Sequence, residues 1–260
     1  MPNVGEEDEL KTKLELCRLQ QSEDIADAFK LFRIFGEKSY DGIIVCCPYT
    51  KKYISADEVC KTPSGFKADV CVYFFYTNEY RFVSIKSENG SKYSVVNHTP
   101  RHSNVFQSGY LSNHLDDLDF IVSRMNTQRK EKTSSQDIHI ENLGVFTRRR
   151  QDALIDLLVY FTFIGSGAKV SDQPADSVLV IRDNTMTFFD CITPTQKKHY
   201  ASILYPRMTL SMRHKQIPPE PKHVTRKSKE IYDKKMELCK PWIFEYTEKK
   251  NDKIKGVFGH

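Results

Sequence analysis

Residues 66–96 constrain the fold of this chain more than any other stretch of its sequence. Residues 70–75 read VCVYFF, so both faces of a strand formed here are apolar, as in a central strand covered on both sides. Residues 80–86, which follow a short polar turn, alternate in the manner of a second strand. The pattern predicts a buried β-hairpin, with Asp69 on its first strand and Lys86 at the end of its second.

The composition suits a folded protein. Of the 260 residues, 39% are apolar and 28% are charged, which is enough apolar material for one large domain, or for one domain with an extension. No apolar run approaches the roughly 18–20 residues that span a bilayer, so no membrane partner is expected. The acidic, polar start MPNVGEEDELKTK is unlike a secretory signal or an Arg-rich transit peptide.

The seven cysteines show no CxxC spacing, and their number is odd. They have the character of small buried hydrophobic residues in a reducing compartment, which predicts an intracellular protein of the cytoplasm or the nucleus. The eight histidines are scattered, so the sequence offers no set of zinc ligands.

Two helices are expected before the hairpin, within 6–20 and 25–35. In the first, Leu10, Leu14 and Cys17 form one apolar stripe. Ser22 is the expected N-cap of the second.

Further patterns complete a mixture of helices and strands. Apolar residues at helical spacing mark 115–125 and 150–164, a continuous apolar run marks a strand at 42–48, and a second hairpin spans 177–189. A helix after Pro194, a last strand within 204–212 and a basic helix at 227–239 follow. The whole predicts an α/β fold.

Positive charge gathers at the C-terminal end of the chain. The net charge is +5, but residues 207–260 carry 14 Lys and Arg against 7 Asp and Glu, or +7, so the preceding 206 residues sum to −2. A proline-containing linker, IPPEP, begins at residue 217. We expect a domain at 1–215 and a basic C-terminal extension at 216–260, which either binds a polyanion or is a solvated tail.

An acid on one strand and a lysine near the end of the next can serve metal-dependent phosphodiester cleavage. Such a site needs acidic oxygens that hold Mg²⁺ against a phosphate oxygen, and a cation near the attacking water or the developing charge. Because strand side chains alternate, Ser84 and Lys86 share a face, which Asp69 on the neighbouring strand can share too. The other interpretation is a hairpin with one solvated acid and one solvated lysine.

The segments KADV and VSIKSENGSKYSV resemble the core of the PD-(D/E)XK nuclease superfamily, especially its restriction-endonuclease-like members, some of which have serine in the second motif. The order of helix, Asp-bearing strand, Lys-bearing strand and helix is similar as well. The resemblance implies a restriction-endonuclease-like mixed β-sheet flanked by helices. It also implies a Mg²⁺-dependent endonuclease that hydrolyses double-stranded DNA in the manner of a type II restriction enzyme. Enzymes that cut both strands are frequently dimers, so a homodimer is one expected form.

The resemblance also implies roles for individual residues. Asp69 would ligate the metal, and Lys86 would orient or activate water and screen the phosphate. Ser84 stands where the family has its second acid and would act through water. Ser94 and Asn97 would contact metal-bound water or a backbone phosphate. Ala68 replaces the proline that names the motif.

Because Ser84 is a poor magnesium ligand, a further carboxylate is needed. The candidates are Glu23, Asp24, Asp27, Asp57, Glu58 and Glu88, of which Glu23 and Asp27 lie on a helix that often brings an extra acid to such sites. Without one, the protein would be a catalytically inactive module that binds nucleic acid on the same fold.

Basic residues are candidates for contacts to the phosphate backbone, which add affinity without reading sequence. They are Arg148, Arg149, Arg150, Arg207, Arg213 and Lys215. Three arginines at the start of a helix oppose the helix dipole, which favours a functional reason for them. A third interpretation is a structural interaction protein that docks through its basic tail.

Overall fold

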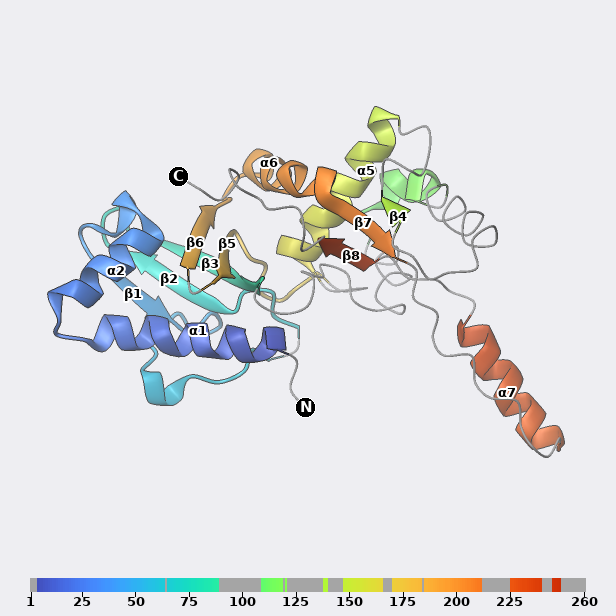
Figure 1. Cartoon of the computed structure of the whole chain (residues 1–260), viewed down its shortest axis with the longest axis horizontal. Coiled ribbons are helices and arrows are strands. Elements are labelled where there is room, and N and C mark those ends of the chain that lie inside the picture. Colours follow the sequence, from blue (N-terminus) through green and yellow to red (C-terminus); the bar gives the residue numbers. More distant parts are fainter. Residues whose placement is uncertain are drawn as a thin grey trace.

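The computed structural model describes residues 4–63, 65–88, 109–118, 120, 138–139, 147–165, 170–183, 185–211, 225–239 and 245–248. Their largest unit is a five-stranded mixed sheet with helices packed on both faces (Figure 1). The predicted α/β class is therefore confirmed. None of the helices in these ranges combines the length and the apolar character that crossing a bilayer requires.

The sheet has the order β1-β2-β3-β5-β6. These strands are β1 (Ile43–Cys46), β2 (Val70–Phe74), β3 (Glu79–Ser87), β5 (Ser177–Arg182) and β6 (Thr185–Asp190). Neighbours are antiparallel except for β3 and β5, which are parallel. The parallel pair lies at the centre of the sheet, where both faces are covered, and this explains the apolar character of β2 and β5.

The predicted central hairpin is confirmed as β2 and β3. Val70 pairs with Val83 and Phe74 with Glu79, so the turn occupies residues 75–78. Asn78 has a positive φ of 56°, a conformation that asparagine tolerates better than most residues. The hairpin of β5 and β6 also lies where the sequence predicts it.

Two N-terminal helices cover one face of the sheet. They are α1 (Val4–Gln21) and α2 (Ile25–Phe35). Their apolar side chains pack against Val83 and Ile85 of β3. Asp24, rather than the predicted Ser22, caps α2 by accepting a hydrogen bond from the backbone N–H of Ala26 at 2.8 Å.

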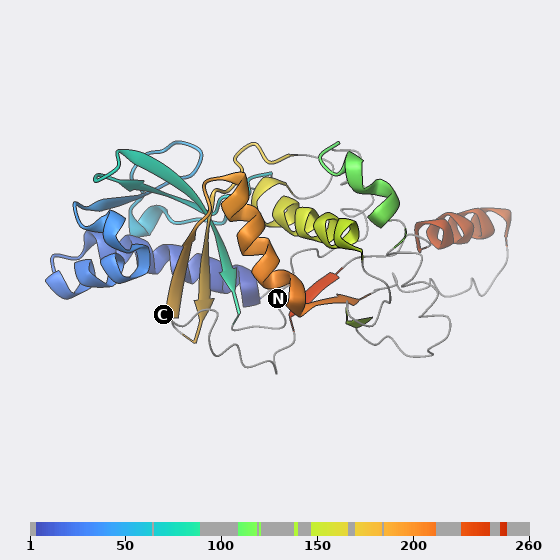
Figure 2. The same cartoon turned by 90° about the horizontal axis from the view of Figure 1, so that it is seen from above.

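The other face is covered by two later helices. These are α5 (Arg148–Val159), continued by the single wide turn η6 (Tyr160–Ile164), and α6 (Pro194–Leu204). Their side chains pack against Val178 and Val180 of β5. Seen from above, α5 and α6 lie on the opposite side of β5 and β6 from α2 (Figure 2).

A second, three-stranded sheet has the order β4-β7-β8. Its strands are β4 (Ile138–His139), β7 (Met208–Ser211) and β8 (Glu245–Glu248). The strand predicted within 204–212 is therefore shorter than expected, because α6 ends at Leu204 and the short helix η7 (Tyr205–Arg207) follows. The basic helix α7 (Arg226–Cys239) lies away from both sheets (Figures 1 and 2).

Candidate active site

Asp69 lies immediately before β2, at a point where β3 continues past its partner strand. Its backbone N–H donates to the carbonyl of Val83 at 2.8 Å, as the last bond of that side of the ladder. The next N–H that β3 directs to this side belongs to Ile85, and it donates to Oδ2 of Asp69 at 2.7 Å. The carboxylate thus replaces a strand partner, and its position is fixed by the backbone of β3.

Ser84 is fully buried, and its hydroxyl donates to Oδ2 of Asp69 at 3.3 Å. The sequence predicted that this residue acts through water. In the structure its hydroxyl contacts the aspartate directly and so helps to fix the orientation of the Asp69 carboxylate.

Lys86 follows two residues later on the same face of β3, half-buried. Its ammonium donates to the carbonyl of Ile85 at 3.1 Å, which folds the side chain back over the end of the strand. Asp69 and Lys86, the two residues that define the candidate site in the sequence, therefore lie at the same end of the hairpin, Asp69 just before β2 and Lys86 near the end of β3.

The structure brings an unexpected carboxylate to this place, that of Glu9 on α1. The hydroxyl of Thr62 lies 3.2 Å from Oδ1 of Asp69 and 3.3 Å from Oε1 of Glu9, so one side chain bridges the two acids. Lys13, one turn along α1, pairs with Glu9 at 3.2 Å and also donates to Thr62.

The electrostatics of Glu9 confirm that these groups act on one another. Burial raises the pKa of the Glu9 carboxyl, and the negative charge of Asp69 raises it further. Lys13 and Lys86 act in the opposite direction, without cancelling the increase. Glu9, Asp69 and Lys13 therefore meet at the hydroxyl of Thr62, and the charge of Lys86 at the end of β3 acts on Glu9. We call these four residues, with Thr62, the Asp69 cluster.

Glu9 was not among the predicted site residues, because the predicted apolar stripe of α1 is only partly its buried face, and Cys17 alone in that stripe is fully buried. Leu10, predicted in the apolar stripe, is 42% exposed, whereas Lys13 is only 5% exposed. The buried face runs through Glu9, Lys13, Leu16 and Gln20, and Gln20 hydrogen-bonds the backbone of β1. A Glu–Lys pair four residues apart, in line with a buried leucine, is the signal that could have found it.

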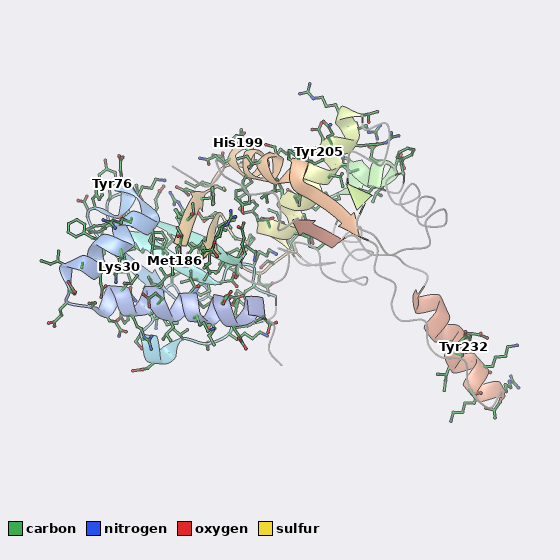
Figure 3. All side chains as sticks on the ribbon, viewed as in Figure 1. Lys30, Tyr76, Met186, His199, Tyr205 and Tyr232 are labelled. Atoms are coloured by element: carbon green, nitrogen blue, oxygen red, sulfur yellow. The ribbon has the colours of Figure 1, made fainter. Side chains whose placement is uncertain are left out.

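The acids that the sequence proposed have other contacts in the structure. Asp27 pairs with Lys30 at 2.6 Å on the outer side of α2, where Lys30 points to solvent (Figure 3). Glu58 accepts hydrogen bonds from the backbone and hydroxyl of Ser55 in a capping box. Glu23 is exposed, and Glu88 lies 3.9 Å from Arg182. Asp57 is exposed, and Asp24 is the helix cap described above.

The three arginines at the start of α5 are partly neutralised. Arg149 pairs with Asp117 at 2.6 Å, and Arg150 lies 3.8 Å from the same carboxylate and 3.5 Å from the ring centre of Phe120. Arg148 is exposed. Asp117 offsets the conflict between these charges and the helix dipole, so that conflict no longer argues for a functional role.

The remaining candidates for phosphate contacts are not placed in detail. Ser94, Asn97, Arg213 and Lys215 lie outside the described residues. Arg207 ends η7, and its side chain is outside the described atoms.

The donor set of the Asp69 cluster suits a hard cation. Within the described residues, no group of three or more His, Cys, Asp or Glu side chains is arranged to hold a metal ion. Magnesium, however, is often bound through one or two carboxylates, with water and substrate phosphate completing its shell. Glu9 and Asp69 could supply such a pair, since an ionised carboxylate has about four acceptor positions and Asp69 uses only some of them here.

Comparisons with protein-family models, with curated proteins and with solved structures found no match to this chain.

Proposed function

We propose that the protein is a Mg²⁺-dependent endonuclease that hydrolyses phosphodiester bonds of double-stranded DNA, built on a restriction-endonuclease-like fold of the PD-(D/E)XK type. The observation that carries the proposal is the bridge from Glu9 through Thr62 to Asp69, with Lys86 close enough to lower the pKa of Glu9. It supplies the second carboxylate that Ser84 cannot provide.

The connections of the sheet support the same proposal. The Asp-bearing end of β2 pairs with the Lys-bearing strand β3 in a hairpin, α5 follows, and the chain then returns to a strand parallel to β3. The resemblance to the nuclease family rests on the order of helix, Asp-bearing strand, Lys-bearing strand and helix within this arrangement.

In the proposed mechanism each residue has one task. Glu9 and Asp69 would hold Mg²⁺, which would polarise the scissile phosphate and lower the pKa of a bound water. Lys86 would orient the attacking water and offset the charge that develops on the phosphate. Thr62 and the backbone N–H of Ile85 fix the orientation of Asp69 before substrate binds, and Lys13 holds Glu9.

A cleavage assay tests this proposal. Supercoiled plasmid and phage DNA are incubated with the protein in Mg²⁺ or in EDTA, and nicked and linear products are quantified. We expect cleavage in Mg²⁺ alone, and a loss of at least ~100-fold for Lys86→Ala, because a positioned catalytic group contributes about 10²–10⁴-fold. Lys52→Ala, at an exposed lysine on the same domain, is the matched control.

Absence of cleavage on varied DNA substrates, or cleavage that Lys86→Ala leaves unchanged, would contradict the proposal. If both strands are cut in one binding event, we expect a dimer, and light scattering of the DNA-bound protein measures this.

The second candidate function is binding of nucleic acid without cleavage. It is favoured by one observation, that the position of the usual second acid is held by Ser84 and that this serine bonds Asp69. In that case affinity for DNA falls steeply with salt concentration. The DNA stays uncut in Mg²⁺ and in EDTA, with the wild type and with Lys86→Ala.

A further inference from the structure

A second feature lies beside Asp69, a small pocket with an unusual lining of thiols. Lys13, Thr62 and Asp69 form one part of its wall, and four cysteines form another. These cysteines are Cys17, Cys46, Cys47 and Cys60. The enclosed space is about 20 Å³, enough for one water molecule. All four are free thiols.

Two of these thiols meet at one tyrosine. The hydroxyl of Tyr49 lies 3.9 Å from Sγ of Cys60 and also hydrogen-bonds the side chain of Cys47. Cys47 and Cys60 therefore line the same small pocket on either side of the Tyr49 hydroxyl. Tyr49 is 45% exposed, so its side chain can swing outward without leaving a void in the core.

The surroundings distinguish Cys47 from the deeper thiols. Burial raises the pKa of Cys17 and of Cys46 to about 11, so both remain protonated and unreactive. Burial also acts on Cys47, but hydrogen bonds from Thr50 and Tyr49 outweigh it and lower the pKa of this thiol. Cys47 is buried at 9% exposure and Cys60 is exposed at the rim of the same pocket, so a small oxidant reaches Cys47 past Cys60.

We propose that Cys47 and Cys60 form an intramolecular disulfide when the protein meets hydrogen peroxide. The thiolate of Cys47 attacks one peroxide oxygen, the O–O bond breaks, and a sulfenic acid and hydroxide result; the proton lost from Cys47 converts the hydroxide to water. The thiol of Cys60 then attacks the sulfenic sulfur, forms the S–S bond and releases a second water. The two thiols lose two electrons, and the peroxide gains them.

Closing this disulfide would alter the Asp69 cluster, a consequence that rests on the proposed function. The carbonyl of Cys60 accepts a hydrogen bond from Lys13 at 3.5 Å, and Thr62, two residues later, bridges Glu9 and Asp69. Drawing Cys60 toward Cys47 pulls on both contacts. Oxidation would therefore lower Mg²⁺-dependent cleavage, and a thiol reductant would restore it.

The disulfide is tested on the full chain, treated with hydrogen peroxide, alkylated and digested without reduction. We expect the wild type to lose two of its seven thiols and to give a cross-linked peptide pair containing Cys47 and Cys60. Cys60→Ser should give no such pair and should instead accumulate a sulfenic acid at Cys47, which dimedone traps. Cys191→Ser is the control, because Cys191 is buried in the opposite face of the sheet and its loss should leave the pair unchanged.

Unchanged thiol content in the wild type, or loss of two thiols that persists in Cys60→Ser, would overturn the proposal. Circular dichroism of each variant excludes unfolding as the cause. The peptide mapping needs no enzymatic activity, so failure to cleave DNA in either redox state would contradict the proposed function and leave the disulfide result standing. If the disulfide is mapped but oxidation leaves the cleavage rate unchanged, only the coupling between the disulfide and the Asp69 cluster is contradicted.

Discussion

The two ends of β3 carry charge clusters that look alike in sequence and differ in structure. At the start of the strand, Arg81 is the centre of what we call the Arg81 cluster, formed with Glu79, Asp190 and Lys38. At its far end is the Asp69 cluster. Both combine acids with basic residues from different elements, and both contain one deeply buried cation, Arg81 at 4% exposure and Lys13 at 5%.

The Arg81 cluster is closed, in the sense that its acids and its basic residues pair with one another. The guanidinium donates to Asp190 at 3.0 Å, to Glu79 at 2.6 Å and to the carbonyl of Tyr80 at 2.9 Å. Asp190 also pairs with Lys38. Burial alone would lower the pKa of Arg81, but its hydrogen bond to Glu79 and the charge of Asp190 raise it instead. The fold thus stabilises these groups in their charged form and leaves little reason for another ion to bind.

The Asp69 cluster has the opposite character. The pKa of Glu9 is raised by burial and by Asp69 despite two nearby lysines, so its charged form is disfavoured in the fold. Within the described residues, the Lys86 ammonium donates a hydrogen bond to a backbone carbonyl, that of Ile85. A cluster that costs stability and keeps donors and acceptors available is what a binding or catalytic site requires. The difference between the two ends of β3 therefore separates a structural cluster from a candidate functional one.

The largest effect on the cleavage rate should come from Asp69→Asn. Loss of a metal-binding carboxylate should lower the cleavage rate by about 1,000-fold or more, since a bound cation supplies several kcal/mol of transition-state stabilisation. The remaining amide oxygen can still accept from Ile85, so folding should change little. Initial rates of plasmid nicking measure the first effect and thermal unfolding the second. Asp57→Asn, at an exposed acid, should cleave like the wild type, and equal losses in both variants would argue against the assignment.

Arg81→Met should lower stability and leave the cleavage rate unchanged, the reverse of Asp69→Asn. Removing one partner of a buried ion pair leaves a buried charge partly uncompensated and costs about 3–5 kcal/mol. We expect this loss in the free energy of unfolding measured by urea denaturation, with the cleavage rate per folded molecule unchanged. If Arg81→Met instead abolished cleavage without loss of stability, the distinction between the two clusters would be wrong.

Lys13→Met should have an intermediate effect, because Lys13 positions Glu9 and Thr62 without reaching the proposed metal itself. Loss of such a supporting contact typically lowers metal affinity or activity by about 10–100-fold. The variant should need a higher Mg²⁺ concentration for half-maximal cleavage. Lys11→Met, at an exposed position on the same helix, is the control. A lower maximal rate at an unchanged Mg²⁺ requirement would mean that Lys13 does not act through the metal.

The sequence predicted the strands and helices that carry the two clusters, but not all the residues that form them. The hairpin and the helices were predictable because a strand or an amphipathic helix repeats its apolar residues at a fixed period. Asp69 and Lys86 followed from that frame, since paired strands place their ends together. Glu9 did not, because a charged residue on a buried helix face looks exposed until its partners Thr62 and Lys13 are known. Its contact with Thr62 joins residues 53 positions apart, and no local pattern contains that information.

In the metal-free protein, Glu9→Gln should give the smallest change in stability, with the opposite sign to that of Arg81→Met. In the metal-free protein the folded-state pKa of Glu9 lies above its ordinary value of 4.5, so the folded state holds this proton more tightly than the unfolded state does. The contribution of Glu9 to stability is then fully present below about pH 4.5 and is lost as the pH rises through the folded pKa.

At neutral pH, glutamine avoids this cost, so Glu9→Gln in EDTA should unfold at a slightly higher temperature than the wild type, and the difference should vanish at acidic pH. Glu23→Gln, at an exposed acid, should show no such trend. Mg²⁺ should reverse the order of the two proteins, because an ion that binds only the folded state stabilises it and the variant has lost one of its two carboxylates. A variant that is less stable than the wild type in EDTA at neutral pH would show that Glu9 belongs to a closed cluster like that of Arg81.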